Sequence, residues 1–111
     1  MPHYADKIPE FEDRLKAVGE RLERLYGAKF KPFTFIQVMV RKRMHPVAIA
    51  EVLEYMAENY QEIKVPWAWA YSATIVRSRN QYEREYQDRS RFQKREFGAL
   101  IDALKKMRSE L

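Results

Sequence analysis

Helix-breaking residues are scarce in this chain of 111 residues, which contains only three glycines and five prolines. They leave long segments in which nothing interrupts a helix, whereas a sheet of many short strands needs turn residues far more often. The length suits one domain with a single core. The sequence therefore predicts an all-α fold over residues 1–111: a compact bundle of four to five helices with a long polar, arginine-rich helical region towards the C-terminus.

The first predicted helix runs from about Pro9 to Tyr26. Its apolar residues recur at spacings of 4, 3, 4 and 3 and therefore share one helical face: Phe11, Leu15, Val18, Leu22 and Leu25. The other face is charged. Gly27 supplies a C-terminal stop. This pattern is typical of a helix that packs on a core.

A second, shorter helix is expected from an N-cap at Thr34 to about Arg43. The β-branched residues that alternate over 36–40 also fit a strand, but an isolated strand would have nothing to pair with, so we favour the helix. Pro46 suits the first turn of a third helix that reaches Tyr60.

The second and third predicted helices, joined by a tight turn, resemble a helix-turn-helix in outline. However, the exposed face of the third helix is acidic, because it carries Glu51, Glu54, Glu58 and Glu62. An acidic helix will not lie in a DNA major groove, so we do not expect this helix to read bases.

A fourth helix is predicted to start at Pro66, with an apolar face that packs on the third helix: Trp67, Ala70, Tyr71, Thr74 and Ile75. We expect the core to span about 9–76. A basic helical extension should follow over about 77–95, with apolar residues too sparse for a well-buried stripe. A final amphipathic helix is expected over about 97–111, after Gly98.

The positive charge is concentrated in residues 64–95, which hold eight bases and three acids and account for the whole net charge of +5. A local excess of this kind attracts polyanions. We therefore take the following as candidate phosphate contacts: Arg77, Arg79, Arg84, Arg89, Arg91, Lys94 and Arg95. Tyr82 and Tyr86 are candidates for stacking on unpaired bases. The alternative is a solvated helix face whose arginines pair with Glu83, Glu85 and Asp88.

Two further groups of residues are candidates for contact with a partner. Arg41, Lys42 and Arg43 form a second basic cluster that extends the surface or, alternatively, complements the dipole at a helix C-terminus. Trp67, Trp69 and Phe92 are aromatic. We expect both tryptophans to join the core, with one of them as a partner-binding anchor as the alternative. Phe92 would contribute to self-association of the basic helix.

The sequence indicates no catalytic site, metal site or cofactor. It has no cysteine, and its only histidines are His3 and His45, of which we expect the second to be a turn residue. No glycine-rich phosphate loop is present, so we expect a protein that is not an enzyme. The N-terminus does not read as a signal peptide, and no window is apolar enough for a membrane span, which predicts a cytoplasmic protein with no membrane partner.

Residues 35–86 resemble the C-terminal domain of DnaD-like replication-initiation proteins. The resemblance lies in the Val40-Arg41 helix end, the segment HPVAIAEVLEYM over 45–56 and the helix start PWAWAY over 66–71. A Tyr-x3-Ile-x3-Trp motif marks the last core helix of that family; Tyr71 and Ile75 match it, and Arg79 stands in place of the Trp. The resemblance implies an all-helical domain that binds DNA through Tyr71, Ile75 and the helix beyond them, and that helps to load a replicative helicase in bacteria and their phages.

Together these features predict a DNA-binding accessory factor that contacts DNA without reading its sequence, with single strands slightly favoured over duplex. The alternative is a protein-interaction or assembly module, such as a phage or bacterial adaptor or inhibitor, whose basic helix docks on an acidic protein partner.

Overall fold

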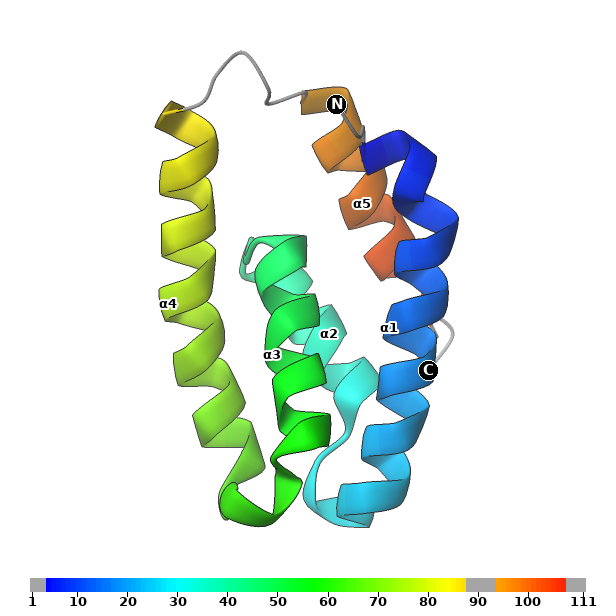
Figure 1. Cartoon of the computed structure of the whole chain (residues 1–111), viewed down its shortest axis with the longest axis vertical. Coiled ribbons are helices and arrows are strands. Elements are labelled where there is room, and N and C mark those ends of the chain that lie inside the picture. Colours follow the sequence, from blue (N-terminus) through cyan, green and yellow to red (C-terminus); the bar gives the residue numbers. More distant parts are fainter. Residues whose placement is uncertain (1–3, 88–93, 108–111) are drawn as a thin grey trace.

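The computed structural model describes residues 4–87 and 94–107, and it describes side chains over 10–86 and 98–107. These residues form an all-α bundle, which confirms the predicted fold class. Its elements are α1 (Tyr4–Tyr26), the 3-10 turn η1 (Gly27–Lys29), α2 (Pro32–Arg41), α3 (Pro46–Glu58), the 3-10 turn η2 (Tyr60–Glu62), α4 (Pro66–Gln87) and α5 (Lys94–Lys106) (Figure 1).

The ends of α1 and α2 follow the local sequence. α1 begins at Tyr4, earlier than predicted, and ends at Tyr26 as expected, where Gly27 takes a φ of 59°. The predicted N-cap at Thr34 is wrong. α2 begins at Pro32, with Lys31 at the N-cap and no side-chain bond to the cap, because the fixed φ of a proline already suits the first helical position.

The basic region of 77–95 is divided between two helices in the described residues, with 88–93 lying outside them. α4 extends to Gln87, and α5 begins at Lys94, so Lys94 and Arg95 belong to α5 rather than to α4. Gly98, which we expected to precede the final helix, lies inside it. Glycine is tolerated in a helix at a cost of about 1 kcal/mol relative to alanine, so it need not end one.

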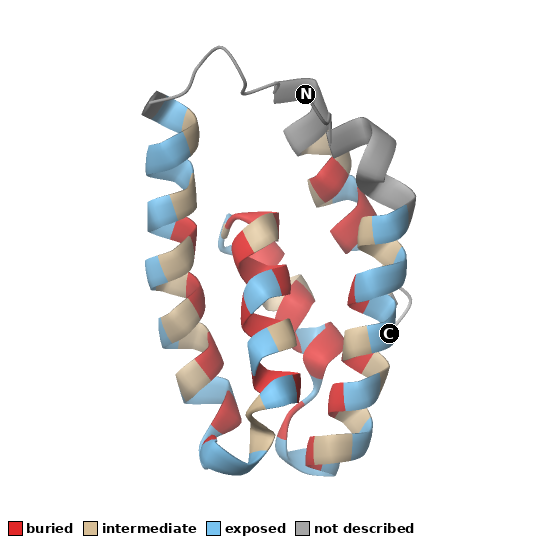
Figure 2. Cartoon of the chain, in the orientation of Figure 1, coloured by how far each residue is buried: buried red, intermediate tan, exposed pale blue. Residues whose placement is uncertain are grey.

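The core is shared by all five helices. Buried side chains line α2, α3 and the inner faces of α1 and α5, and α4 covers the remaining side of α3 (Figure 2). The predicted packing of the fourth helix on the third is confirmed, and α5 lies against α1 and α2. The ring of Phe33 on α2 packs directly over Gly19 of α1.

Helices α3 and α4 run antiparallel (Figure 1) and contact each other through polar and aromatic pairs at one edge. The rings of Tyr55 and Trp69 stack with centroids 5.3 Å apart and planes at 14°. Arg77 Nη1 lies 3.1 Å from Glu51 Oε2. The α4 side of the contact extends beyond the core limit that we expected near residue 76, because Ser78 is also buried.

α2 holds the C-terminal end of α5 in place. Gln37 Nε2 donates to the carbonyl oxygens of Leu104 and Met107, at 3.0 Å in each case. The last carbonyls of a helix have no partner within it, so a side-chain amide at this place satisfies them. Leu100, Ala103 and Leu104 are buried beneath this contact.

Candidate nucleic-acid interface

The turn between α2 and α3 carries three consecutive basic side chains, Arg41, Lys42 and Arg43, and all three are exposed. The amide of Met44 bonds to the carbonyl of Met39, and that of Arg43 to the carbonyl of Val40, at 3.0 Å in each case. This pair of bonds is the Schellman motif, which ends a helix with one residue in the left-handed conformation.

Arg43 is the residue in the left-handed conformation, with a φ of 61°, and no other non-glycine residue in the described ranges has a positive φ. Glycine is the usual occupant of this position, because a Cβ there costs roughly 1–2 kcal/mol. A basic side chain is therefore kept at this turn at a cost in stability. Backbone strain of this kind is frequent at functional sites.

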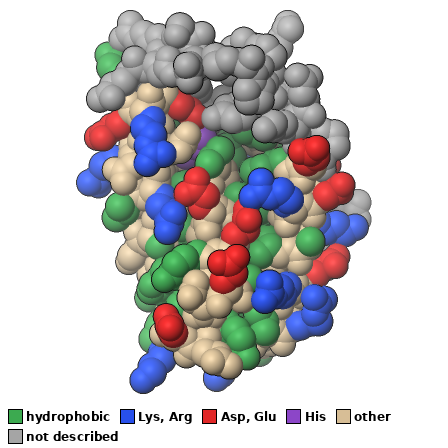
Figure 3. Space-filling model, viewed as in Figure 1, with side chains coloured by type: hydrophobic (Ala, Val, Ile, Leu, Met, Phe, Trp, Pro, Cys, Tyr) green, Lys and Arg blue, Asp and Glu red, His purple; other side chains and the backbone are tan. Residues whose placement is uncertain are grey.

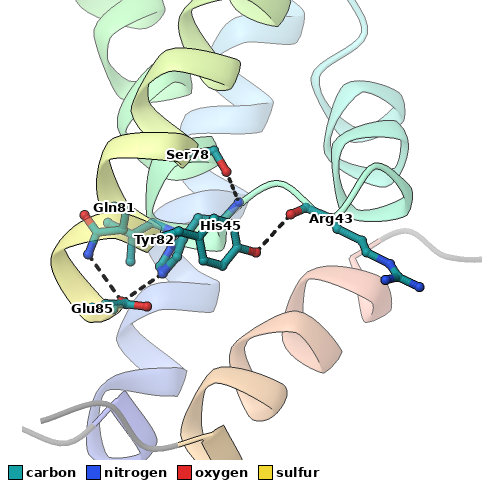
Figure 4. Close-up of polar contacts among 7 residues, drawn as sticks. Arg43, His45, Ser78, Gln81, Tyr82 and Glu85 are labelled. Atoms are coloured by element: carbon teal, nitrogen blue, oxygen red, sulfur yellow. Dashed lines mark hydrogen bonds and ion pairs between the residues drawn. The ribbon is translucent and has the colours of Figure 1, made fainter. Parts of the chain in front are cut away.

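The basic turn is fastened to α4 along one face of that helix. The Tyr82 hydroxyl donates to the Arg43 carbonyl oxygen at 2.9 Å, and the amide of His45 donates to Ser78 Oγ at 2.8 Å (Figure 4). Lys42 Nζ lies 5.6 Å from the centre of the Tyr71 ring, within the range of a cation–π contact. Thus α4 and the turn form one continuous surface.

The predicted basic residues of α4 fall on two faces of the helix. Arg79, Tyr82 and Tyr86 are spaced by three and four residues and so share the face that adjoins the basic turn. Arg77 and Arg84 are seven residues apart and share a different face. Arg77 is paired with Glu51 of α3.

Charges of both signs are interspersed on the face of the molecule seen in Figure 3. Two ion pairs join neighbouring helices: Arg77–Glu51 between α4 and α3, and Arg14–Glu54 between α1 and α3. We define the basic surface as the exposed side chains of Arg41, Lys42, Arg43, Arg79 and Tyr86.

Tyr82 and Tyr86, predicted to stack on bases, and Tyr71, which the resemblance implies as a DNA contact, differ in how exposed they are. Tyr86 is 69% exposed, and Tyr82 is 36% exposed with its hydroxyl bonded to Arg43. Tyr71 is half-buried beneath Lys42. Burial, with Glu85 nearby, raises the pKa of Tyr82 above its ordinary value, so it remains a neutral donor. Tyr86 is thus the ring best placed to stack on a base.

The structure describes no side chain for five of the predicted site residues. Arg89, Arg91 and Phe92 lie outside the described residues. Lys94 and Arg95 are in the first turn of α5, and their side chains are not among those described.

The two tryptophans are only partly in the core. Trp67 is 39% exposed while its ring contacts Phe30 and Phe35, and Trp69 is half-buried against Tyr55. Both residues therefore pack against the protein without being fully removed from solvent.

His45 is the residue whose role the sequence did not indicate. It caps α3, since its Nδ1 accepts from the amide of Val47 at 3.1 Å, and it is completely buried. Its Nε2 lies 2.8 Å from Glu85 Oε1, which also accepts from Gln81 Nε2 at 3.3 Å (Figure 4). Because Nδ1 is an acceptor, the ring is neutral and Nε2 carries the hydrogen. Burial lowers the pKa of His45 below its ordinary value, although the hydrogen bond and charge of Glu85, and the charge of Glu51, act in the opposite direction.

Ser78, His45 and Glu85 are the residue types of a nucleophilic triad, but they are not arranged as one. Ser78 Oγ accepts from the backbone amide of His45 rather than bonding to its ring. Both ring nitrogens already have other partners, Val47 and Glu85. A triad needs the imidazole to accept the serine proton, so this geometry does not activate Ser78.

The sequence of α4 contains one feature that could have indicated the contacts of His45, a line of small and polar residues along one helical face. Ala70, Thr74, Ser78 and Glu85 continue one helical face at spacings of four, four and seven, and its first three residues are buried. We interpreted the region beyond residue 76 as an extension because its apolar residues are sparse. In the fold, hydrogen bonds take the place of apolar packing there.

Within residues 4–87 and 94–107, no helix is long and apolar enough to cross a membrane. The same residues contain no group of three or more histidine and acidic side chains that would hold a metal ion.

The chain matches no protein-family model, and comparison with curated proteins and with solved structures finds no significant match to it.

Proposed function

We propose that this protein is a non-catalytic DNA-binding accessory factor that contacts DNA without reading its sequence, through the basic surface of the α2–α3 turn and α4. The observation that carries the proposal is Arg43, a cation held in a left-handed backbone conformation at a turn tied to α4. Arg41 and Lys42 flank it, and Arg79 lies on the adjoining face of α4. Guanidinium groups pair well with phosphate oxygens.

A role in replication initiation or helicase loading rests on the resemblance carried by Tyr71 and Ile75. A replicative helicase would then be the protein partner. Phosphate contacts alone carry no sequence information, which fits an accessory factor rather than a regulator that selects a site.

The proposal is tested by fluorescence anisotropy with labelled single-stranded and duplex oligonucleotides, from about 50 to 200 mM salt, where phosphate contacts weaken steeply. The test variant is Arg41→Gln/Lys42→Gln/Arg79→Gln. The matched control is Lys16→Gln/Arg24→Gln/Lys29→Gln, which removes the same charge from exposed positions on α1 and η1. We expect the test variant to lose affinity about tenfold or more and to show a shallower salt slope, by up to about one unit per lost phosphate contact.

The control variant is expected to bind nearly as well as the wild-type protein. Equal losses in the two variants would mean that only total charge matters, and absence of binding at low salt would overturn the proposal. In the same assay, Tyr86→Ala should weaken single-strand binding by about 1–3 kcal/mol and duplex binding less, if the exposed ring stacks on a base.

A protein-interaction module is the second candidate, and the exposed apolar residues of α4 favour it. Val76 is 57% exposed, Trp67 is 39% exposed and Trp69 is half-buried. Large exposed aromatic groups are frequent at the centre of protein interfaces. Sedimentation of the wild type and of Arg77→Ala/Arg79→Ala/Arg89→Ala/Arg91→Ala distinguishes the two functions. Loss of assembly favours the interaction module, and loss of DNA affinity with unchanged assembly favours the DNA-binding factor.

A further inference from the structure

The contacts around His45 join three parts of the molecule. Its ring caps α3 through Val47, its amide bonds to Ser78 in the middle of α4, and its Nε2 reaches Glu85 near the end of α4. The ring of Tyr82 packs edge-on against it with centroids 5.0 Å apart, and the Tyr82 hydroxyl holds the carbonyl of Arg43. We call His45, Ser78, Tyr82 and Glu85 the histidine clamp.

The cap that the clamp provides for α3 requires a neutral ring, and this follows from the geometry at Nδ1. The Val47 amide points its hydrogen at Nδ1, so a proton added there would set two donors against each other at 3.1 Å. The ring would have to turn, and α3 would lose its cap. Glu85 on α4 and Glu51 on α3 act on the ring by their charge, and Tyr82 is a further titratable neighbour.

We propose that the histidine clamp is an acid-sensitive device: protonation of His45 removes the cap of α3 and loosens the distal part of α4, residues 78–87, from the basic turn. Burial opposes a charge on this ring, and the pKa of His45 is accordingly below its ordinary value. A turned ring would no longer pack edge-on against Tyr82, whose hydroxyl holds the Arg43 carbonyl, so the basic turn would be less firmly joined to α4. The clamp itself does not depend on the proposed function, whereas its effect on DNA binding does.

Histidine is suited to such a device because its ordinary pKa lies near physiological pH, and burial moves the change of charge of His45 into the acidic range. The proposal predicts that DNA affinity changes with pH in the direction opposite to that expected from simple electrostatics. Adding a positive charge beside a basic surface should strengthen DNA binding as the pH falls. Disassembly of the surface should weaken it instead.

The first experiment measures hydrogen exchange of the full chain at pH 7.5 and 5.0, with protection factors corrected for the intrinsic pH dependence of exchange. The comparison variant is His45→Asn, because an asparagine side chain also accepts a bond at an N-cap and does not titrate. We expect protection in the first turn of α3 and over 78–87 to fall several-fold at pH 5.0 in the wild type. Protection in His45→Asn should be the same at both pH values, and protection in α1 should not change in either protein.

Equal protection at the two pH values in the wild type would overturn the proposal. So would an acid-induced loss in His45→Asn, since another group would then be responsible. If His45→Asn does not fold, an NMR titration of the wild type decides: the Val47 amide signal must shift with the same midpoint as the His45 ring. A Val47 signal that is insensitive to the titration of the ring overturns the clamp.

A second experiment repeats the anisotropy titration at pH 7.5 and 5.5 at constant ionic strength. We expect wild-type affinity to fall on acidification and His45→Asn affinity to stay constant. Affinity that rises in the wild type overturns the link between clamp and surface. Absence of DNA binding at both pH values, with the exchange result intact, refutes the proposed function and leaves the clamp standing.

Discussion

Gly19 is the residue of α1 against which the Phe33 ring of α2 packs. An added Cβ at this position would lie 2.6 Å from Cζ of the Phe33 ring, closer than atoms can pack without a shift. Glycine in a helix costs about 1 kcal/mol relative to alanine, so its presence here needs a reason. The close approach of the Phe33 ring supplies it. The sequence alone did not indicate this contact, because the partner ring comes from another helix.

Replacement of the two helical glycines by alanine should have opposite effects. Gly19→Ala should lower the free energy of unfolding by about 1–3 kcal/mol, because Phe33 must move out of a packed core. Gly98→Ala should raise it by about 0.5–1 kcal/mol, because a Cβ there meets nothing within 4 Å and the helix gains propensity. Urea denaturation of both variants measures the difference. A stabilised Gly19→Ala would contradict the packing, and Gly19→Ala/Phe33→Leu should recover part of the loss.

Arg43 is the converse of Gly19, because a residue with a side chain occupies a left-handed backbone position that glycine adopts at a lower cost in free energy. The sequence identified Arg41, Lys42 and Arg43 as a cluster but not the conformation of the last of them. A Schellman turn without glycine leaves little local signal, because the bonds that define it involve only the backbone.

Arg43→Gly is therefore expected to raise the free energy of unfolding by about 1 kcal/mol while lowering affinity for DNA. Arg41→Gly is the matched control. It removes the same charge at the last residue of α2, where glycine should lower stability by up to about 1 kcal/mol. Denaturation and anisotropy on the two variants give both quantities. Loss of stability in Arg43→Gly would mean that the side chain itself supports the turn.

Among the elements, α4 departs most from its expected form. Its helical nature and its packing on α3 were predicted from the apolar residues at its start. Its distal half was expected to be an extension of the core, yet Ser78 is buried and Glu85 reaches His45. Periodicity of apolar residues cannot reveal a stripe held by hydrogen bonds, because the partners lie 33 and 40 residues away in the sequence.

Stability should fall in mild acid because of the capping histidine of α3. The folded pKa of His45 is below its ordinary value of 6.5, so the unfolded state binds more protons as the pH falls through that value. The contribution of neutral His45 to the free energy of unfolding is complete above about pH 6.5, and it is lost as the pH falls from there towards the folded pKa. Urea unfolding from pH 8 to pH 5 measures it. His45→Asn should show a shallower decline over the same range, and an identical decline would assign the effect to other groups.

At the scale of the whole molecule, the helix closest to the C-terminus completes the core that α1 begins. The amphipathic pattern of Leu100, Leu104 and Met107 predicted a helix that packs, and this was confirmed. Its place against α1 and α2 was not predictable from the pattern, because an apolar stripe does not specify which neighbour covers it. The bonds from Gln37 fix that place.

Leu104→Ala should lower the free energy of unfolding by about 2–5 kcal/mol, because the side chain is fully buried at the junction of α5 with the core. Ile101→Ala, at a half-buried position one turn away, should cost clearly less. Thermal and urea denaturation of the two variants compare them. Equal costs would mean that α5 does not close the core as its contacts indicate.

The return of α5 to α1 also bears on the order in which the molecule folds. α3 and α4 are joined by a short connection and can pair early, whereas α5 must meet a helix from the far end of the chain, at a larger loss of chain entropy. Contacts made by α5 should therefore form after the main barrier, so that Leu104→Ala accelerates unfolding and leaves the folding rate nearly unchanged. The helix that completes the core would then control how long the folded protein persists rather than how quickly it forms.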